Sequence, residues 1–319
     1  MGRRARDRRT SGSTATTVRT SAATWARSPS DVTGRRTGGP AHDVRGRSRP
    51  SPGHDRDRDR DRPGHRDRAL RRFIADSTPV IAGGRAILLQ IADPVVAAGV
   101  RRHSDFAERP QQRLAHTLMY VYAVVTGTAR DAAVARSFVE HAHRPVAGAN
   151  EVDRQLWVAA TLYDSAIRTH RLLGTPVDAE RAEAVLRAYA PIATALRVPA
   201  DRWPTSVAAF EAYWTETLGT LRVTDDARSV VRDLLHPRAA PLWVRSAMPL
   251  VRIVTVGMLP DAVRDDYGFA WGPREERRWR RTLAGIRAVR AVVPGPLLRL
   301  PRVLLLHGMH RTAARHAHH

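Results

Sequence analysis

Three side chains that could carry chemistry share one flank of residues 106–126, a segment whose apolar residues have helical spacing. Arg113, His116 and Thr117 stand at positions i, i+3 and i+4, so they are neighbours on a helix surface. A guanidinium can pair with an anion, an imidazole can bind a metal or carry a proton, and a hydroxyl can donate a hydrogen bond. Two further histidines, His141 and His143, end the segment that follows. These residue types suit a site for a cofactor.

The positions of His116 and His143 about Gly127 would bring both residues to similar levels on two antiparallel helices. His116 lies 11 residues before Gly127 and His143 lies 16 residues after it. At about 1.5 Å per residue these are about 17 Å and about 24 Å from the turn, a difference of about 7 Å. A cofactor between the helices would meet both side chains. A histidine at a helix end is also a common partner of the helix dipole, so the spacing alone does not establish a cofactor.

Several other chemistries lack their residues in this chain. There is no cysteine, which excludes disulfides, zinc–cysteine sites, iron–sulfur clusters, thiol nucleophiles and covalent haem attachment. There is also no P-loop, GxGxxG fingerprint, GxSxG elbow or HExxH pair. The chemistry must therefore come from polar groups on otherwise apolar helices.

Charge is concentrated near the start of the chain. All 53 basic residues are arginine, and the formal net charge is +22. Residues 1–70 hold 18 Arg and 8 Asp, or +10, which leaves +12 for the other 249 residues. A segment so poor in apolar residues cannot offset its chain entropy by burial, and we predict a disordered tail over residues 1–68. Its arginines make nucleic-acid binding an alternative function, although no basic motif interleaved with aromatic residues supports it.

The rest of the chain reads as helix. Apolar residues recur at helical spacing, and no run alternates with the period of a strand. We predict an all-α fold with a single large domain over residues 69–305 and a basic, histidine-containing tail over residues 306–319. Thr128 with Asp131, Thr205 and Thr224 stand where helix N-caps are expected. The predicted helices cover residues 79–100 as a pair, 106–126, 129–143, 152–173, 178–198, 205–220, 225–235, 241–258 and 275–293.

Seven stretches, in order along this domain, resemble the MpaB and latex-clearing-protein oxygenase family. Their common order is more specific than any one of them. They are residues 82–90 (Ala-Gly-Gly-Arg-Ala-Ile-Leu-Leu-Gln), 113–117 (Arg-Leu-Ala-His-Thr), 143–148 (His-Arg-Pro-Val-Ala-Gly), 156–162 (Leu-Trp-Val-Ala-Ala-Thr-Leu), 204–205 (Pro-Thr), 257–260 (Gly-Met-Leu-Pro) and 264–268 (Arg-Asp-Asp-Tyr-Gly).

The resemblance implies a buried cavity that holds haem b noncovalently, with dioxygen as co-substrate. The family cleaves carbon–carbon double bonds of isoprenoid chains, so the expected substrate is hydrophobic, unsaturated and isoprenoid-like. His143, in the family's His-x-x-Val-x-Gly pattern, would be the axial ligand of the haem iron. Arg113 and Thr117, in its Arg-x-x-x-Thr pattern, would line the haem and take part in catalysis. His116, where latex-clearing proteins have a lysine that can close the other axial site, is a third catalytic candidate.

Plainer roles stay open for these three candidates. Arg113 would serve equally in a salt bridge between helices, Thr117 in a hydrogen bond to its own helix, and His116 as a surface residue. Two departures from the family also bear on activity, because this chain has Ala159 and Asp93 where many members have histidine. A catalytically degenerate member that binds haem or a lipid is therefore the first alternative function.

The C-terminal region has a second motif of interest. Residues 275–293 combine arginines with apolar residues at helical spacing, which predicts a basic amphipathic helix, and a leucine-rich stretch follows it over residues 297–306. Core packing with a basic rim would explain it, and contact with an anionic membrane is the alternative. No apolar run follows Arg3-Arg4 before Arg72, and the apolar residues 79–100 are interrupted by polar ones, so we expect a cytoplasmic chain, membrane-peripheral at most.

Overall fold

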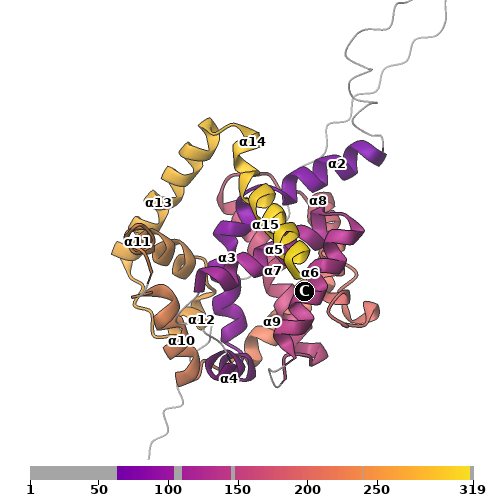
Figure 1. Cartoon of the computed structure of the whole chain (residues 1–319). Helices are drawn as coiled ribbons and strands as arrows, with labels where there is room; N and C mark the ends of the chain where they lie inside the picture. The colour runs from indigo at the N-terminus through magenta and orange to yellow at the C-terminus, as the bar shows by residue number, and fades with distance from the viewer. Residues whose placement is uncertain (1–62, 104–109, 145–147, 239, 317–319) are drawn as a thin grey trace, which may run out of the picture. The chain divides into compact units, whose positions relative to one another are not determined.

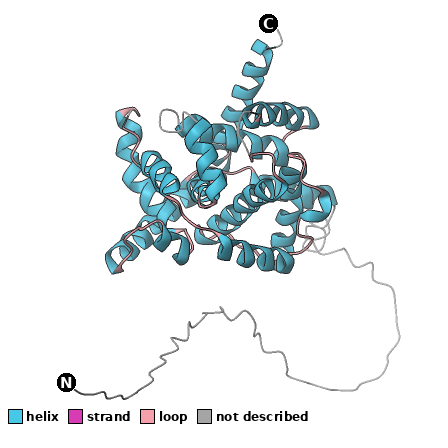
Figure 2. Cartoon of the chain, turned by 90° about the horizontal axis from the view of Figure 1, so that it is seen from below, coloured by secondary structure: helices cyan, strands magenta, loops and turns pink. Residues whose placement is uncertain are grey.

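The computed structural model describes residues 63–103, 110–144, 148–238 and 240–316, without the side chains at 63–67, 103, 110–113 and 312–316. This described part contains α-helices, one short 3-10 helix and no strand, as Figure 2 shows, which confirms the all-α prediction. The helices are α2 (Pro63–Ile74), α3 (Thr78–Ile91), α4 (Pro94–His103), α5 (Pro110–Thr126), α6 (Ala129–His143), α7 (Val152–Leu172), α8 (Ala179–Thr194), η1 (Ala200–Arg202), α9 (Val207–Thr220), α10 (Asp225–Leu235), α11 (Leu242–Gly257), α12 (Asp261–Asp266), α13 (Pro273–Val292), α14 (Gly295–Leu298) and α15 (Leu300–His316).

The turn between α5 and α6 follows from local sequence signals. α5 ends at Thr126, directly before Gly127. The Thr128 backbone N–H donates to the Asp131 carboxylate at 2.8 Å, and the Asp131 N–H donates to the Thr128 hydroxyl at 3.2 Å. This reciprocal pair is the predicted capping box, and the amide at residue 128 is the main reason that the pKa of Asp131 lies below its ordinary value. The two helices pack against each other, as the short turn requires.

Three predicted boundaries need correction. α9 is capped by Ser206 rather than Thr205, because the Ser206 hydroxyl accepts the Ala209 N–H at 3.1 Å. α8 ends at Thr194 rather than 198, and Arg197 then turns the chain with φ of 74°. α13 begins at Pro273, two residues early, because proline fits the first helical turn.

α3 and α7 form the centre of the domain. They pack against each other along their lengths, with the other helices around them (Figure 1). Leu88 and Leu89 of α3 are fully buried, as are Tyr122 of α5 and Tyr189 of α8. Helices that are apolar on nearly every side belong in the interior, which explains why residues 82–89 show little amphipathic pattern.

The apolar residues 79–100 form two helices, as predicted. α3 and α4 meet at an angle of 103° around Asp93, whose carboxylate accepts the backbone N–H groups of Val95 and Val96 at 2.8 and 3.0 Å. Within the described residues, no single helix has the length and hydropathy to cross a membrane, and only this bent pair passes that test when its halves are joined.

The C-terminal region packs differently from the prediction. The expected domain end after residue 305 falls inside α15, which continues to His316. Leu306 and Met309 on this helix are 9% and 1% exposed, because α15 lies against α5 and α6. At the other end, α2 begins at Pro63, inside the segment predicted as tail.

Candidate functional site

A cavity of about 650 Å³ lies among α3, α4, α5, α6, α7, α8 and α15. Most of its wall is aliphatic or aromatic, so it favours an apolar occupant. Its apolar lining includes Ile87, Ile91, Val96, Val100, Met119, Phe138, Val139, Val158, Leu162, Ile192, Leu196, Leu305 and Met309.

The histidines singled out in the sequence reach this cavity from two helices. His116 and Thr117 of α5 line it, and so do His141 and His143 at the end of α6. His116 and His141 are exposed, whereas Thr117 and His143 are half-buried. The structure therefore brings His116 and His143 to one space, as their spacing about the turn indicated.

Arg113, the remaining predicted site residue, belongs to α5. Its side chain lies outside the described residues, and its role stays a prediction. Gly148, which closes the His143 stretch, also lines the cavity and adopts φ of +79°. Only glycine takes that conformation without strain, so the motif's glycine shapes the entry to α7.

The cavity also has a polar corner that the sequence analysis missed. Gln90 and Gln155 line it, together with Arg154. The Gln90 amide donates to Thr161 at 2.9 Å, and the Gln155 amide donates to the Ala149 carbonyl at 3.2 Å. The Gln155 carbonyl oxygen is buried and meets no hydrogen-bond donor within the described part of the chain. A ligand that carries a hydrogen-bond donor would satisfy it.

Arg154 brings a guanidinium to this corner, and its buried Nε–H has no hydrogen-bond acceptor within the described residues. Its guanidinium pairs with Glu151 and lies 3.7 Å from the Asp93 carboxylate. The side chain is 21% exposed, which lets it face the cavity while it stays hydrated on one side. The only sequence signal for Arg154 and Gln155 is that they directly precede the stretch 156–162.

The two departures from the family pattern have structural explanations. Asp93 caps α4, as described above, and contacts Arg154. Ala159 is fully buried in α7 and is absent from the cavity wall, to which α7 contributes Arg154, Gln155, Val158 and Leu162. Because neither Asp93 nor Ala159 lines the cavity, neither departure takes a side chain away from the cavity wall.

His170 and His236 are not cavity residues in the described structure, and the side chain of His103 lies outside it. His170 stacks on Phe73 with ring centroids 3.7 Å apart and is 2% exposed. His236 is exposed, and its ring lies 3.1 Å from the Arg232 carbonyl oxygen. We assign both to packing and surface.

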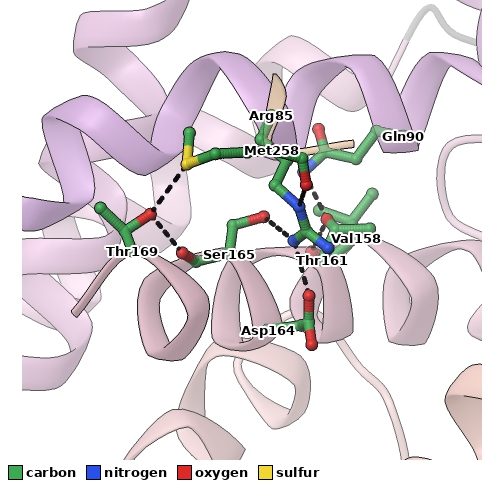
Figure 3. Close-up of polar contacts among 8 residues, drawn as sticks. All are labelled: Arg85, Gln90, Val158, Thr161, Asp164, Ser165, Thr169 and Met258. Carbon is green, nitrogen blue, oxygen red and sulfur yellow. Dashed lines mark hydrogen bonds and ion pairs between the residues drawn. The ribbon is translucent and has the colours of Figure 1, made fainter. Parts of the chain in front are cut away.

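Arg85 gives a structural role to residues 82–90, another of the stretches that resemble the family. Its guanidinium is buried between α3 and α7, where it donates to the Ser165 hydroxyl and the Met258 carbonyl at 2.8 Å each and pairs with Asp164 at 2.6 Å (Figure 3). Burial lowers the pKa of Arg85, and Asp164 opposes this effect. Arg85 thus holds the helices that carry the cavity wall and does not reach the cavity itself.

The stretch 264–268 is also structural. The Tyr267 hydroxyl donates to the Leu88 carbonyl at 2.7 Å, and the Asp266 carboxylate accepts the Val223 N–H at 2.7 Å. Burial raises the pKa of Tyr267, so its hydroxyl stays protonated as the donor. These bonds tie α12 to α3 and to the start of α10, behind the cavity.

Known proteins can now be compared with this arrangement. Residues 71–288 match the family described as "ER-bound oxygenase mpaB/B'/Rubber oxygenase, catalytic domain". Two similar proteins are the uncharacterized proteins Rv2237 of Mycobacterium tuberculosis and Mb2261 of Mycobacterium bovis. Each is 28% identical over 222 residues, which cover 65% of this chain and 87% of the relative. No solved structure matches the chain. The family match spans more than half of the chain and every cavity-lining helix except α15, so the chain belongs to the MpaB and rubber oxygenase catalytic-domain family.

Proposed function

We propose that this chain is a haem b-dependent oxygenase that cleaves a double bond of an apolar, isoprenoid-like substrate. The observation that carries the proposal is the cavity of about 650 Å³, apolar over most of its wall, with His116 and His143 facing it from two helices. Family membership supports an oxygenase. The cofactor and the substrate class are inferred from this cavity and the resemblance.

The residues present fit a haem group. A haem group brings four nitrogen ligands of its own, so the protein needs to contribute only one or two more. Within the described residues no group of three or more His, Asp or Glu could hold a bare metal ion, whereas the half-buried imidazole of His143 would hold the haem iron. The volume also lies in the range of about 300–1,000 Å³ that is usual for ligand and cofactor sites.

Each part of the wall has a role in this proposal. His143 would hold the haem iron, and the guanidinium of Arg154 would meet its carboxylate edge, helped by Arg113. When bound, haem supplies the chemistry that activates dioxygen. Phe138, Val158 and Leu162 exclude water and orient the substrate's double bond. The reaction balances without another reductant, because one C=C bond and one O₂ give two C=O groups.

Thr117 provides the sharpest functional test. Thr117 lines the cavity, as His116 does, and we propose that its hydroxyl donates a hydrogen bond during catalysis. Replacing it by valine keeps the side-chain shape and removes the donor, which should lower turnover about tenfold. Thr215→Val is the matched control, since Thr215 is an exposed helix threonine on α9 that donates to the Glu211 carbonyl at 2.8 Å.

The assay supplies ¹⁸O₂ and squalene, a polyunsaturated isoprenoid, and analyses products by mass spectrometry. Products are reduced with borohydride at once, because carbonyl oxygens exchange with water. We expect label in both new carbonyl groups, with Thr117→Val slow and Thr215→Val at the wild-type rate. Bound haem without oxygen uptake on squalene or other isoprenoids would instead support the haem- or lipid-binding alternative.

A further inference from the structure

The end of α13, together with α14 and α15, carries an apolar surface that no described part of the chain covers. α13 packs through Leu283, which is 3% exposed, and through half-buried Ile286. Further along the same helix, Val289 and Val292 turn away from these contacts and are 60% and 79% exposed. α14 lies where α13 and α15 meet and the chain reverses (Figure 1). We call the exposed apolar residues of this region the elbow patch: Val289, Val292, Leu297, Leu300, Val303 and Leu304.

The elbow patch lies in a segment of one charge sign. Residues 277–319 contain ten Arg and no Asp or Glu. The two carboxylates that other elements bring to this segment are already paired: Asp76 with Arg290 at 2.8 Å, and Asp131 with His310 at 2.6 Å. Arg277, Arg278 and Arg281 stay exposed on α13. An anionic partner is therefore favoured over a neutral or cationic one.

The elbow patch also adjoins the cavity. Leu304 is 61% exposed and at the same time lines the cavity wall. Gly308, one turn further along α15, is exposed and lines the cavity as well. An apolar molecule that reaches Leu304 from outside would therefore meet the cavity without crossing a polar surface.

We propose that the elbow patch docks on an anionic lipid bilayer and places the entrance of the cavity at the membrane surface. Exposed aliphatic side chains enter the boundary between headgroups and acyl chains, while exposed arginines of the same segment pair with lipid phosphates. An apolar substrate dissolved in the bilayer then reaches the cavity without passing through water. Only this last step rests on the proposed function, since docking itself needs neither haem nor turnover.

Vesicle sedimentation of the full chain tests the docking directly. The probes are phosphatidylcholine vesicles with and without about 30% phosphatidylglycerol, at about 0.1 M and about 0.5 M salt. The arginine-rich residues 1–70 will also attract anionic lipid, but this attraction weakens in high salt, whereas apolar insertion persists. The informative comparison is therefore the one at high salt.

Val292→Ser with Leu297→Ser removes the apolar contacts, and Leu242→Ser with Leu250→Ser is the control. The four residues are 79%, 57%, 77% and 49% exposed, so both pairs remove similar exposed apolar groups, the control pair from α11. Thermal melting checks that both variants fold. At high salt we expect the elbow variant to bind phosphatidylglycerol vesicles at least about tenfold more weakly than wild type, and the control to match wild type.

Three results would overturn the proposal: equal binding by the elbow variant and wild type, no binding by wild type at low salt, or equal loss in both double variants. A dimer in solution that the elbow substitutions abolish, with no vesicle binding, would assign the elbow patch to a second copy of the chain. Because haem plays no part in these measurements, their outcome is separate from that of the oxygenase assay.

Discussion

At the scale of single residues, Arg85 and Arg202 form ion pairs of the same length in different surroundings. Arg85 is 2% exposed and pairs with Asp164 at 2.6 Å, whereas Arg202 is 51% exposed and pairs with Asp153 at 2.6 Å. Replacing Arg85 by methionine leaves Asp164, Ser165 and the Met258 carbonyl without their donor. We expect a loss of about 3 kcal/mol in the free energy of unfolding, measured by urea denaturation.

Arg202→Gln is the control for Arg85→Met, and it should cost less than about 1 kcal/mol. Similar losses in the two variants would mean that burial does not set the strength of the Arg85 interactions. An unchanged stability for Arg85→Met would contradict the assignment of Arg85 as the residue that joins α3 to α7.

His170 makes the stability depend on pH. Burial lowers the pKa of its imidazole to about 4, while an unfolded histidine has a pKa near 6.5. Between these values the unfolded chain binds a proton that the folded chain does not, so stability is lost as the pH falls through this window. From about pH 7 to about pH 5 this loss should amount to about 2 kcal/mol.

His170→Gln should remove that part of the pH dependence, which urea denaturation at the two pH values would show as a shallower fall. The variant loses the stacking on Phe73, so its stability at pH 7 serves as its own reference. If wild type and variant lose stability in parallel, His170 is protonated in the folded chain and its assignment to a dry core contact is wrong.

The site residues that could be predicted from the sequence are those whose types are typical of cofactor binding and catalysis. The sequence pointed to His116, Thr117 and His143, and all three line one cavity. Gln155 and Arg154 were missed because a glutamine or arginine on a helix is usually solvated, and only the packing of α3 against α7 shows that Gln155 is buried. Asp93 caps α4 and Ala159 is buried in α7, both outside the cavity wall, and their effect on activity stays a prediction.

At the scale of elements, the helix boundaries that could be predicted are those set by hydrogen bonds between residues close in the sequence. The Thr128–Asp131 capping box and the Thr224 cap lie where the sequence placed them, since each needs only residues within the first turn. α14 and α15 were missed because Pro294, Pro296 and Pro301 interrupt the apolar pattern. Residues 306–311 are held as helix by contacts with α5 and α6, which local sequence does not reveal.

α15 closes one side of the cavity, and Arg302 and His310 attach it to α5 and α6. Arg302 donates to the Thr126 hydroxyl at 2.8 Å, and His310 lies 2.6 Å from the Asp131 carboxylate. Replacing both by glutamine should weaken the attachment of α15 by about 1–2 kcal/mol, which corresponds to roughly tenfold faster amide exchange along the helix. Hydrogen–deuterium exchange with mass spectrometry measures this change.

The control for this double variant is His307→Gln, because His307 is an exposed histidine on the same helix. It should leave the exchange of α15 unchanged. Exchange in the double variant as slow as in wild type would show that apolar packing of Leu306 and Met309 alone holds the helix closed.

At the scale of the whole molecule, the amino-acid composition indicated the class of protein but did not indicate the chemistry of its site. The net charge of +22 draws attention to nucleic acid, yet the charge lies largely outside the cavity that the described helices build. What joins the distant residues into a site is the packing of seven helices around one space. We therefore propose that this space holds haem through His143.

The measurement that tests this claim most directly is the visible absorption spectrum of the full chain, produced with haem supplied. We compare wild type with His143→Ala and with His141→Ala, the exposed neighbour that also lines the cavity. Wild type and His141→Ala should show a stoichiometric Soret band, and His143→Ala should lose it and regain it when free imidazole is added. A folded wild type with no Soret band, or an unchanged band in His143→Ala, would contradict the account.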